Sequence, residues 1–232
     1  MRKVFFFVFS SFIIFALSCE KDDLTLPVQV DFEFTMDSFH SEGAKKANTF
    51  FEIDKGILNI QQIEFDGRRD QGEDYYFTSG FDFLVQAQLH NKIMSQNISY
   101  DIPQGVYNRI NLNLSIGDGS EDALCLEGRF QKGSMQEVQI IFKYSFQEQI
   151  EIKAKNSIGN DQIVLSKDTQ MKANIIFNVP NLFQLVNMNM IQNAEITIKD
   201  EKEVIEINKE KNIDIFNLLA TRLDNSMRVV FD

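Results

Sequence analysis

The stretch Asp118-Gly119-Ser120-Glu121-Asp122 carries the side chains best suited to bind a metal ion. Asp118, Ser120 and Asp122 offer oxygen atoms at alternate positions, as at the start of a calcium-binding loop. An EF-hand also needs a glutamate at the twelfth position of the loop, and the residue there is Arg129. Strand-like patterns flank the loop. We therefore expect a solvated acidic turn, with calcium binding by these three residues as the alternative.

The other residue types that commonly do chemistry are few and scattered. Two cysteines, Cys19 and Cys125, and two histidines, His40 and His90, have spacings that match no zinc motif. Cys125 falls on the polar-phase face of an expected strand, and both histidines lie in polar stretches. Neither a nucleophile elbow nor a phosphate-binding glycine loop occurs. With 34 acidic residues, no catalytic carboxylate pair stands out. The sequence predicts no enzyme, with a carboxylate-dependent glycan hydrolase as an alternative.

Cys19 lies where an apolar run meets an acidic cluster, in the segment IIFALSCEKDD. Arg2 and Lys3 precede an apolar run from Val4 to Leu17 that only two serines interrupt. A membrane-spanning helix needs about 20 apolar residues, so this shorter run is typical of a secretory signal peptide. We therefore expect residues 1–18 to be a signal peptide.

The residues around this cysteine resemble two signals of bacterial lipoproteins. Ala16-Leu17-Ser18-Cys19 resembles the lipobox, although the leucine stands one position later than in the usual pattern. The resemblance implies cleavage before Cys19 and attachment of diacylglycerol and an acyl chain, which together anchor a protein without a transmembrane helix. Lys21, Asp22 and Asp23 resemble the surface-export signal of Bacteroidota-type lipoproteins. An ordinary secretory signal with an incidental cysteine is the alternative.

These resemblances imply a lipid-anchored outer-membrane protein at the cell surface, with a periplasm-facing position as the alternative. Its partners would be the membrane and the lipoprotein maturation and export machinery. A disulfide between Cys19 and Cys125 is a competing use of the first cysteine. Apart from the covalent lipid, we expect no cofactor. The formal charge of −11 repels phosphate backbones, so we expect no nucleic-acid partner.

Alternation of apolar and polar residues predicts many short strands behind a polar tether at residues 19–27. It occurs in Val28–Thr35, Ile110–Ile116, Leu124–Phe130, Val138–Tyr144, Ile150–Ala154, Met171–Phe177 and Val204–Ile207. Glycine- and proline-containing turns separate these runs. The pattern predicts an all-β, mainly antiparallel β-sandwich, because each strand has one apolar face to bury.

Two helical patterns interrupt the strands near the carboxyl end. Residues 181–190 and 214–223 carry apolar side chains at helical spacing, and residues 227–231 follow as an expected closing strand. We therefore expect one or two short helices in this part. Because no linker is evident, residues 28–232 are expected to form one domain, with two small sandwiches divided near residues 117–122 as the alternative.

The turn Ile102-Pro103-Gln104-Gly105-Val106-Tyr107 and the stretch at residues 52–77 resemble uncharacterised sandwich lipoproteins of the same bacterial type. The resemblance implies an immunoglobulin-like or transthyretin-like fold and no established activity. Proline and glycine suit the reversal, and Tyr107 would re-enter the core. Tyr75-Tyr76-Phe77 offers an aromatic platform for a glycan or protein ligand, although alternation places at least one of these rings in the core.

We therefore expect a non-enzymatic binding or scaffold module. A subunit of a surface fibre or of a transport assembly is the alternative, and an exposed strand edge or a large apolar patch would favour it.

Overall fold

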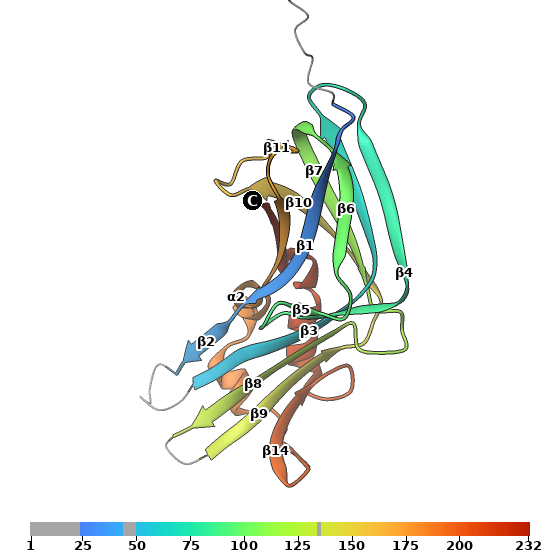
Figure 1. Ribbon diagram of the computed structural model, residues 1–232. Helices are drawn as coiled ribbons and strands as arrows, with labels where there is room; N and C mark the ends of the chain where they lie inside the picture. Colours follow the sequence, from blue (N-terminus) through green and yellow to red (C-terminus); the bar gives the residue numbers. More distant parts are fainter. Residues whose placement is uncertain (1–23, 44–49, 134–135) are drawn as a thin grey trace, which may run out of the picture.

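The computed structural model describes residues 24–43, 50–133 and 136–232 (Figure 1). Fifteen strands form one mixed, largely antiparallel sheet, as the alternating pattern predicts at this coarse level. Their bounds are β1 Pro27–Asp37, β2 Phe39–Glu42, β3 Phe50–Arg69, β4 Tyr75–Gln88, β5 Ile93–Met94, β6 Ile98–Pro103, β7 Gly105–Ile116, β8 Leu124–Lys132, β9 Gln136–Tyr144, β10 Glu148–Asn156, β11 Ile163–Leu165, β12 Met171–Asn178, β13 Thr197–Lys199, β14 Lys202–Ile207 and β15 Met227–Phe231. Three pairings are parallel, namely β1 with β12, β9 with β14 and β10 with β15.

Strand β3 joins the two parts of the molecule. Its first half, Phe50–Leu58, pairs with β8, whereas its second half, from Ile60 to Arg69, pairs with β7. We call β1, β4, β6, β7, β10, β11, β12, β15 and the second half of β3 the upper part, as oriented in Figure 1. The lower part contains the first half of β3 with β2, β8, β9, β13 and β14. The segment at residues 117–122 connects β7 to β8, both of which pair with β3.

Aromatic rings fill the core of the upper part. The ring of Phe65 on β3 stacks on Phe77 of β4 at 5.4 Å, and Phe77 lies 4.5 Å from Tyr100 of β6. Tyr100 in turn meets Phe32 of β1 edge to face at 5.4 Å. Such pairs add to the free energy of burial, so these rings hold β1 and β6 against β3 and β4.

The upper end of the molecule is held by Arg69, at the end of β3. Its Nη2 donates to the backbone oxygens of Leu24 (2.6 Å) and Gln104 (2.7 Å), and its guanidinium lies over the ring of Tyr107. Tyr107 is fully buried and donates its hydroxyl to the backbone oxygen of Pro103, which confirms that it re-enters the core. Arg69 thereby joins the start of the described chain to the turn between β6 and β7.

Short helices lie against the sheet. They are α2 Val179–Leu182, η2 Phe183–Leu185, α3 Met188–Gln192, α4 Ile213–Ala220 and η3 Leu223–Asn225. Helix α4 lies against β14 of the lower part, α3 against β3, and α2 and η3 against β1 and β10 of the upper part, respectively. Phe216 of α4 packs on Phe142 of β9, and Phe183 of η2 packs on Phe51 of β3. The apolar side chains that predicted helices therefore face the sheet.

The prediction of one continuous helix over residues 181–190 is wrong, and three short α-helices replace the one or two expected. Val186 has an extended backbone, and Asn187 starts a new helix because its side-chain oxygen accepts from the amide of Met190. The second helix, predicted over 214–223, ends at Ala220 and is followed by η3. The closing strand is confirmed as β15.

Candidate functional site

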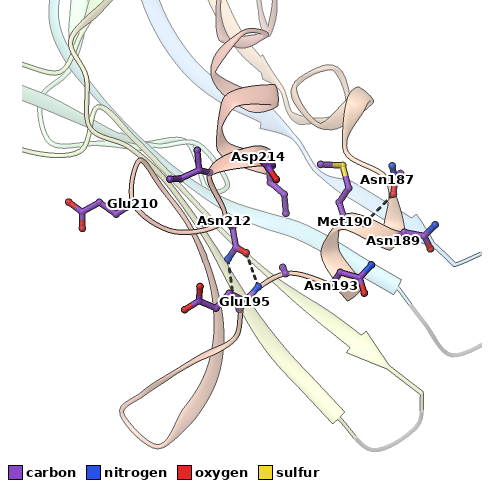
Figure 2. Close-up of a pocket in the computed structure, with 11 residues that line it drawn as sticks. Asn187, Asn189, Met190, Asn193, Glu195, Glu210, Asn212 and Asp214 are labelled. Carbon is purple, nitrogen blue, oxygen red and sulfur yellow. Dashed lines mark hydrogen bonds between the residues drawn. The ribbon is translucent and has the colours of Figure 1, made fainter.

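A hollow of about 620 Å³ lies in the lower part, between α3, the segment at residues 193–195, the loop at residues 210–212 and the start of α4. Figure 2 shows that α3 forms one wall and α4 the other, with the β13–β14 hairpin beyond them. The elements that surround the hollow are packed on the sheet through Ile191 and Ile215, which are both buried. The hollow is therefore held on a fixed support.

Asn212 builds the floor of the hollow by joining three segments. Its Oδ1 accepts from the amide of Glu195 at 2.7 Å, and its Nδ2 donates to the backbone oxygen of Glu195 (Figure 2). Nδ2 also donates to the backbone oxygen of Glu206. Its φ of 52° is left-handed, a conformation that asparagine tolerates better than most residues. Its backbone oxygen also accepts from Ile215 and Phe216, which starts α4. One side chain thus fixes the loop, β14 and the helix together.

Five polar side chains that line the hollow engage no partner within the described ranges. They are the carboxamides of Asn189 and Asn193 and the carboxylates of Glu195, Glu210 and Asp214. All five residues are exposed to solvent. Polar side chains that take no part in holding a fold are free to bind a ligand. The hollow therefore combines a rigid frame with uncommitted hydrogen-bonding groups.

The lining of the hollow is acidic and partly apolar. Three of its residues are carboxylates, and no lysine, arginine or histidine belongs to its described lining. The nearby cations are engaged elsewhere, because Lys211 pairs with Glu206 at 2.6 Å and Lys209 lies over the ring of Phe146. Met190 and Ile213 add aliphatic surface, and the side chain of Ile213 is half exposed. This lining repels anions and accepts hydrogen-bond donors.

The loop proposed as an alternative calcium site uses its oxygens within the protein. The carboxylate of Asp118 accepts from the amide and the hydroxyl of Ser120, and these bonds lower the pKa of Asp118. Asp122 pairs with Lys143 at 3.0 Å. Among the described residues, no group of three or more His, Cys, Asp or Glu side chains is arranged to hold a metal ion. The loop therefore has the features of a structured turn.

Of the other residues singled out from sequence, those that the structure describes do not line the hollow. Cys19, Lys21, Asp22 and Asp23 are outside the described residues. Cys125 is half-buried on β8, and burial raises the pKa of its thiol to about 11, which keeps it protonated and unreactive at neutral pH. His40 and His90 are both exposed, as expected from their polar surroundings.

The aromatic stretch on β4 is divided between core and surface. Tyr75 and Phe77 pack against the core, whereas Tyr76 is 62% exposed. Further along β4, four residues from Phe81 to Leu84 oppose the single residue Gln61 of β3, and Phe83 is 88% exposed on this bulge. Along its other side β4 pairs with β5 only at Ala87 and Gln88, so the rest of that edge has no strand partner in the described chain.

Sequence reasoning missed the hollow, although a compositional signal was present. Asparagines recur in the segment N187-MNMIQ-N193 and in N208-KEK-N212, and these two segments meet across the hollow. Within the described ranges, no helix is long and apolar enough to cross a membrane. In comparisons with known proteins, no family model, curated protein or solved structure matches the chain.

Proposed function

We propose that this protein is an outer-membrane lipoprotein, anchored through lipid on Cys19 and exposed at the cell surface, that acts as a non-enzymatic binding module. The observation that carries the proposal is the hollow, with its five uncommitted polar side chains on a rigid frame. The position of the hollow in the molecule also supports a binding function at the cell surface. The described chain begins at the upper end, whereas the hollow belongs to the lower part (Figure 1). An anchor at the amino end would therefore hold the hollow away from the membrane.

Surface exposure is tested by protease treatment of intact cells that express the wild type or a Lys21/Asp22/Asp23→Ala variant. We expect cleavage of the wild type and protection of the variant. Cleavage of both proteins only after the outer membrane is opened would refute surface exposure. Lysed cells provide the control that both proteins are equally sensitive to the protease.

The lipid anchor is tested separately by metabolic labelling with an alkyne analogue of palmitate. We expect the wild type to be labelled and to remain in the membrane fraction, because two or three acyl chains anchor a protein firmly. A Cys19→Ser variant should lose the label, whereas Cys125→Ser should keep it. Labelling that survives Cys19→Ser would contradict the assignment of this residue.

We also assign residues 28–232 to a single domain of the immunoglobulin-like or transthyretin-like sandwich class. The ring contacts that join β1 and β6 to β3 and β4 support face-to-face packing of strands in the upper part. An experimental structure in which the sheet folds into two layers packed face to face, together with one cooperative unfolding transition, would agree with this assignment. Two independent transitions would favour the division near residues 117–122.

A specific observation favours a second candidate function, as a subunit of a surface assembly. Proteins commonly protect sheet edges with lysine, proline, β-bulges or short strands, yet residues 75–80 of β4 contain neither lysine nor proline and precede the bulge. Phe83 projects from the same strand and suits an apolar pocket of a partner. If β4 docks a partner, Thr78→Lys and Phe83→Ser should abolish cross-linking to that partner in cells, whereas the control Ser115→Lys on β7 should not. Equal cross-linking by all variants would remove this candidate.

A further inference from the structure

We propose that the hollow binds neutral or amino-bearing glycans and rejects acidic ones. This inference rests on the proposed binding function and names the ligand class of the same site. It follows from three properties of the lining: its hydrogen-bonding groups, its charge and its aliphatic surface.

The hydrogen-bonding groups match hydroxyl-rich ligands. The carboxylates of Glu195, Glu210 and Asp214 only accept hydrogen bonds, whereas the carboxamides of Asn189 and Asn193 both donate and accept. A sugar hydroxyl also donates and accepts, so neighbouring hydroxyls can satisfy both kinds of group at once. An ammonium or guanidinium group only donates, so it can bind the carboxylates and the carboxamide oxygens but makes no use of the carboxamide N–H groups. The mixture of carboxylates and carboxamides therefore favours a glycan over a basic peptide.

The charge of the lining selects among glycans. Because no cation belongs to the described lining, a phosphate, sulfate or uronate group would face unpaired carboxylates at short range. Neutral sugars meet no such repulsion, and an amino sugar gains attraction from it. The aliphatic side chains of Met190 and Ile213 complete the match, since they offer apolar surface to the C–H face of a sugar ring.

The two walls carry separable parts of the site. Figure 2 shows Asn189, Asn193 and Met190 on the side of α3, and Glu210 and Asp214 on the side of α4. Within the described lining, only Asn212 and Asn187 hold the fold through hydrogen bonds of their side chains. The exposed asparagines and acids can therefore be replaced without disturbing the frame.

The experiment uses the purified full-length lipoprotein in detergent micelles and isothermal titration calorimetry. The probes are cellotetraose, maltotetraose, mannotetraose, chitotetraose and chitosan tetramer, with tetragalacturonate and tetralysine as the acidic and basic comparisons. We expect at least one neutral or amino-bearing tetrasaccharide to bind and tetragalacturonate not to bind. The Asn189→Ala/Asn193→Ala variant should weaken that binding about tenfold, because two hydrogen bonds are lost.

Matched controls are Asn97→Ala and Glu121→Gln, which change exposed residues of the same types outside the hollow. Their affinity should equal that of the wild type, and all variants should melt at the same temperature. Binding of a neutral tetrasaccharide should persist in high salt, because salt screens charges but not hydrogen bonds between neutral groups.

Three results with a bound probe would overturn the inference. They are binding of tetragalacturonate as strong as that of the neutral sugars, binding of tetralysine alone with loss in salt, and glycan binding that the double asparagine variant leaves unchanged. Absence of binding by all the oligosaccharides would also overturn the inference. Surface exposure and lipid attachment are tested by separate experiments, so this result would leave them unaffected. Release of reducing ends from a bound glycan would instead move the protein to the hydrolase class.

Discussion

The two ends of the molecule are each fixed by one polar side chain, and they differ in what surrounds it. Arg69 at the upper end donates to the backbone oxygens of Leu24 and Gln104. Asn212 in the lower part likewise bonds the backbone of Glu195 and Glu206. Around Arg69 the neighbouring Tyr107 is buried and bonded, whereas around Asn212 five polar side chains have no partner in the described chain.

This difference separates polar groups that hold the fold from polar groups that are available to a ligand. A buried group that loses its partner costs free energy, so the surroundings of Arg69 should tolerate little change. Exposed groups without partners contribute little to stability, so the rim of the hollow should tolerate substitution. Substitutions at the two ends should therefore differ in their effects on stability and on binding.

Arg69→Ala should destabilise the protein by about 3 kcal/mol. The change leaves two backbone oxygens without their donor and removes the cation over the ring of Tyr107. Urea unfolding followed by circular dichroism measures the loss. The neighbouring Arg68→Ala is the matched control, because Arg68 is exposed, and it should change stability by less than about 0.5 kcal/mol. Equal effects of the two substitutions would show that Arg69 does not fix the upper end.

Asn212→Ala should destabilise the protein by about 2 kcal/mol and abolish ligand binding. It removes three hydrogen bonds to backbone groups and places alanine at a φ of 52°. Asn212→Gly accepts this backbone conformation but loses the same bonds, so the difference between the two variants isolates the backbone strain. Urea unfolding and calorimetry give the two readouts. Wild-type binding by either variant would contradict the role of Asn212 in forming the hollow.

Tyr107→Phe should cost about 1 kcal/mol at neutral pH, because it removes one hydrogen bond from a buried side chain. Burial raises the pKa of Tyr107 to about 12 in the folded protein. A phenol whose pKa is higher when folded contributes its full stability below the unfolded pKa of about 10 and loses it as the pH rises towards 12. Unfolding free energies between pH 9 and pH 12 should therefore fall more steeply for the wild type than for Tyr107→Phe. Parallel slopes would show that another group controls the alkaline transition.

Most strands could be predicted from the sequence, because alternation is a local signal. In β1, for example, Val28, Val30, Phe32 and Phe34 are all buried, as the pattern requires. The role of Arg69 could not be predicted, since it depends on residues 45 and 35 positions away in the chain. In the sequence, Arg69 is one of several charged residues in a polar hairpin. Contacts of this length follow only from the complete topology.

The candidate site was harder to predict than the fold. The hollow needs α3, the turn after it and the start of α4 to meet, and the sequence pattern instead favoured one helix over residues 181–190. Asn187 divides this segment into two helices, because its side chain caps a separate helix at a point where the apolar spacing predicts that the first helix continues. Dense asparagines were a usable signal, but only their partners distinguish Asn212, which holds the frame, from Asn193, which is free.

The smallest predicted effect concerns the β13–β14 hairpin beside the hollow. Asp200 and Glu201 in its turn have φ values of 50° and 64°, and such two-residue turns favour Asn-Gly. Asp200→Asn with Glu201→Gly should therefore stabilise the protein by about 0.5 kcal/mol, since glycine removes the strain but has more freedom when unfolded. Lys132→Asn, which changes an exposed residue at the end of β8, is a control that should not stabilise. Thermal unfolding measures both changes. A more stable protein with unchanged glycan affinity would show that the backbone strain of this turn plays no part in ligand binding. A less stable protein would contradict the prediction and would mean that the side chains of Asp200 and Glu201 stabilise the hairpin.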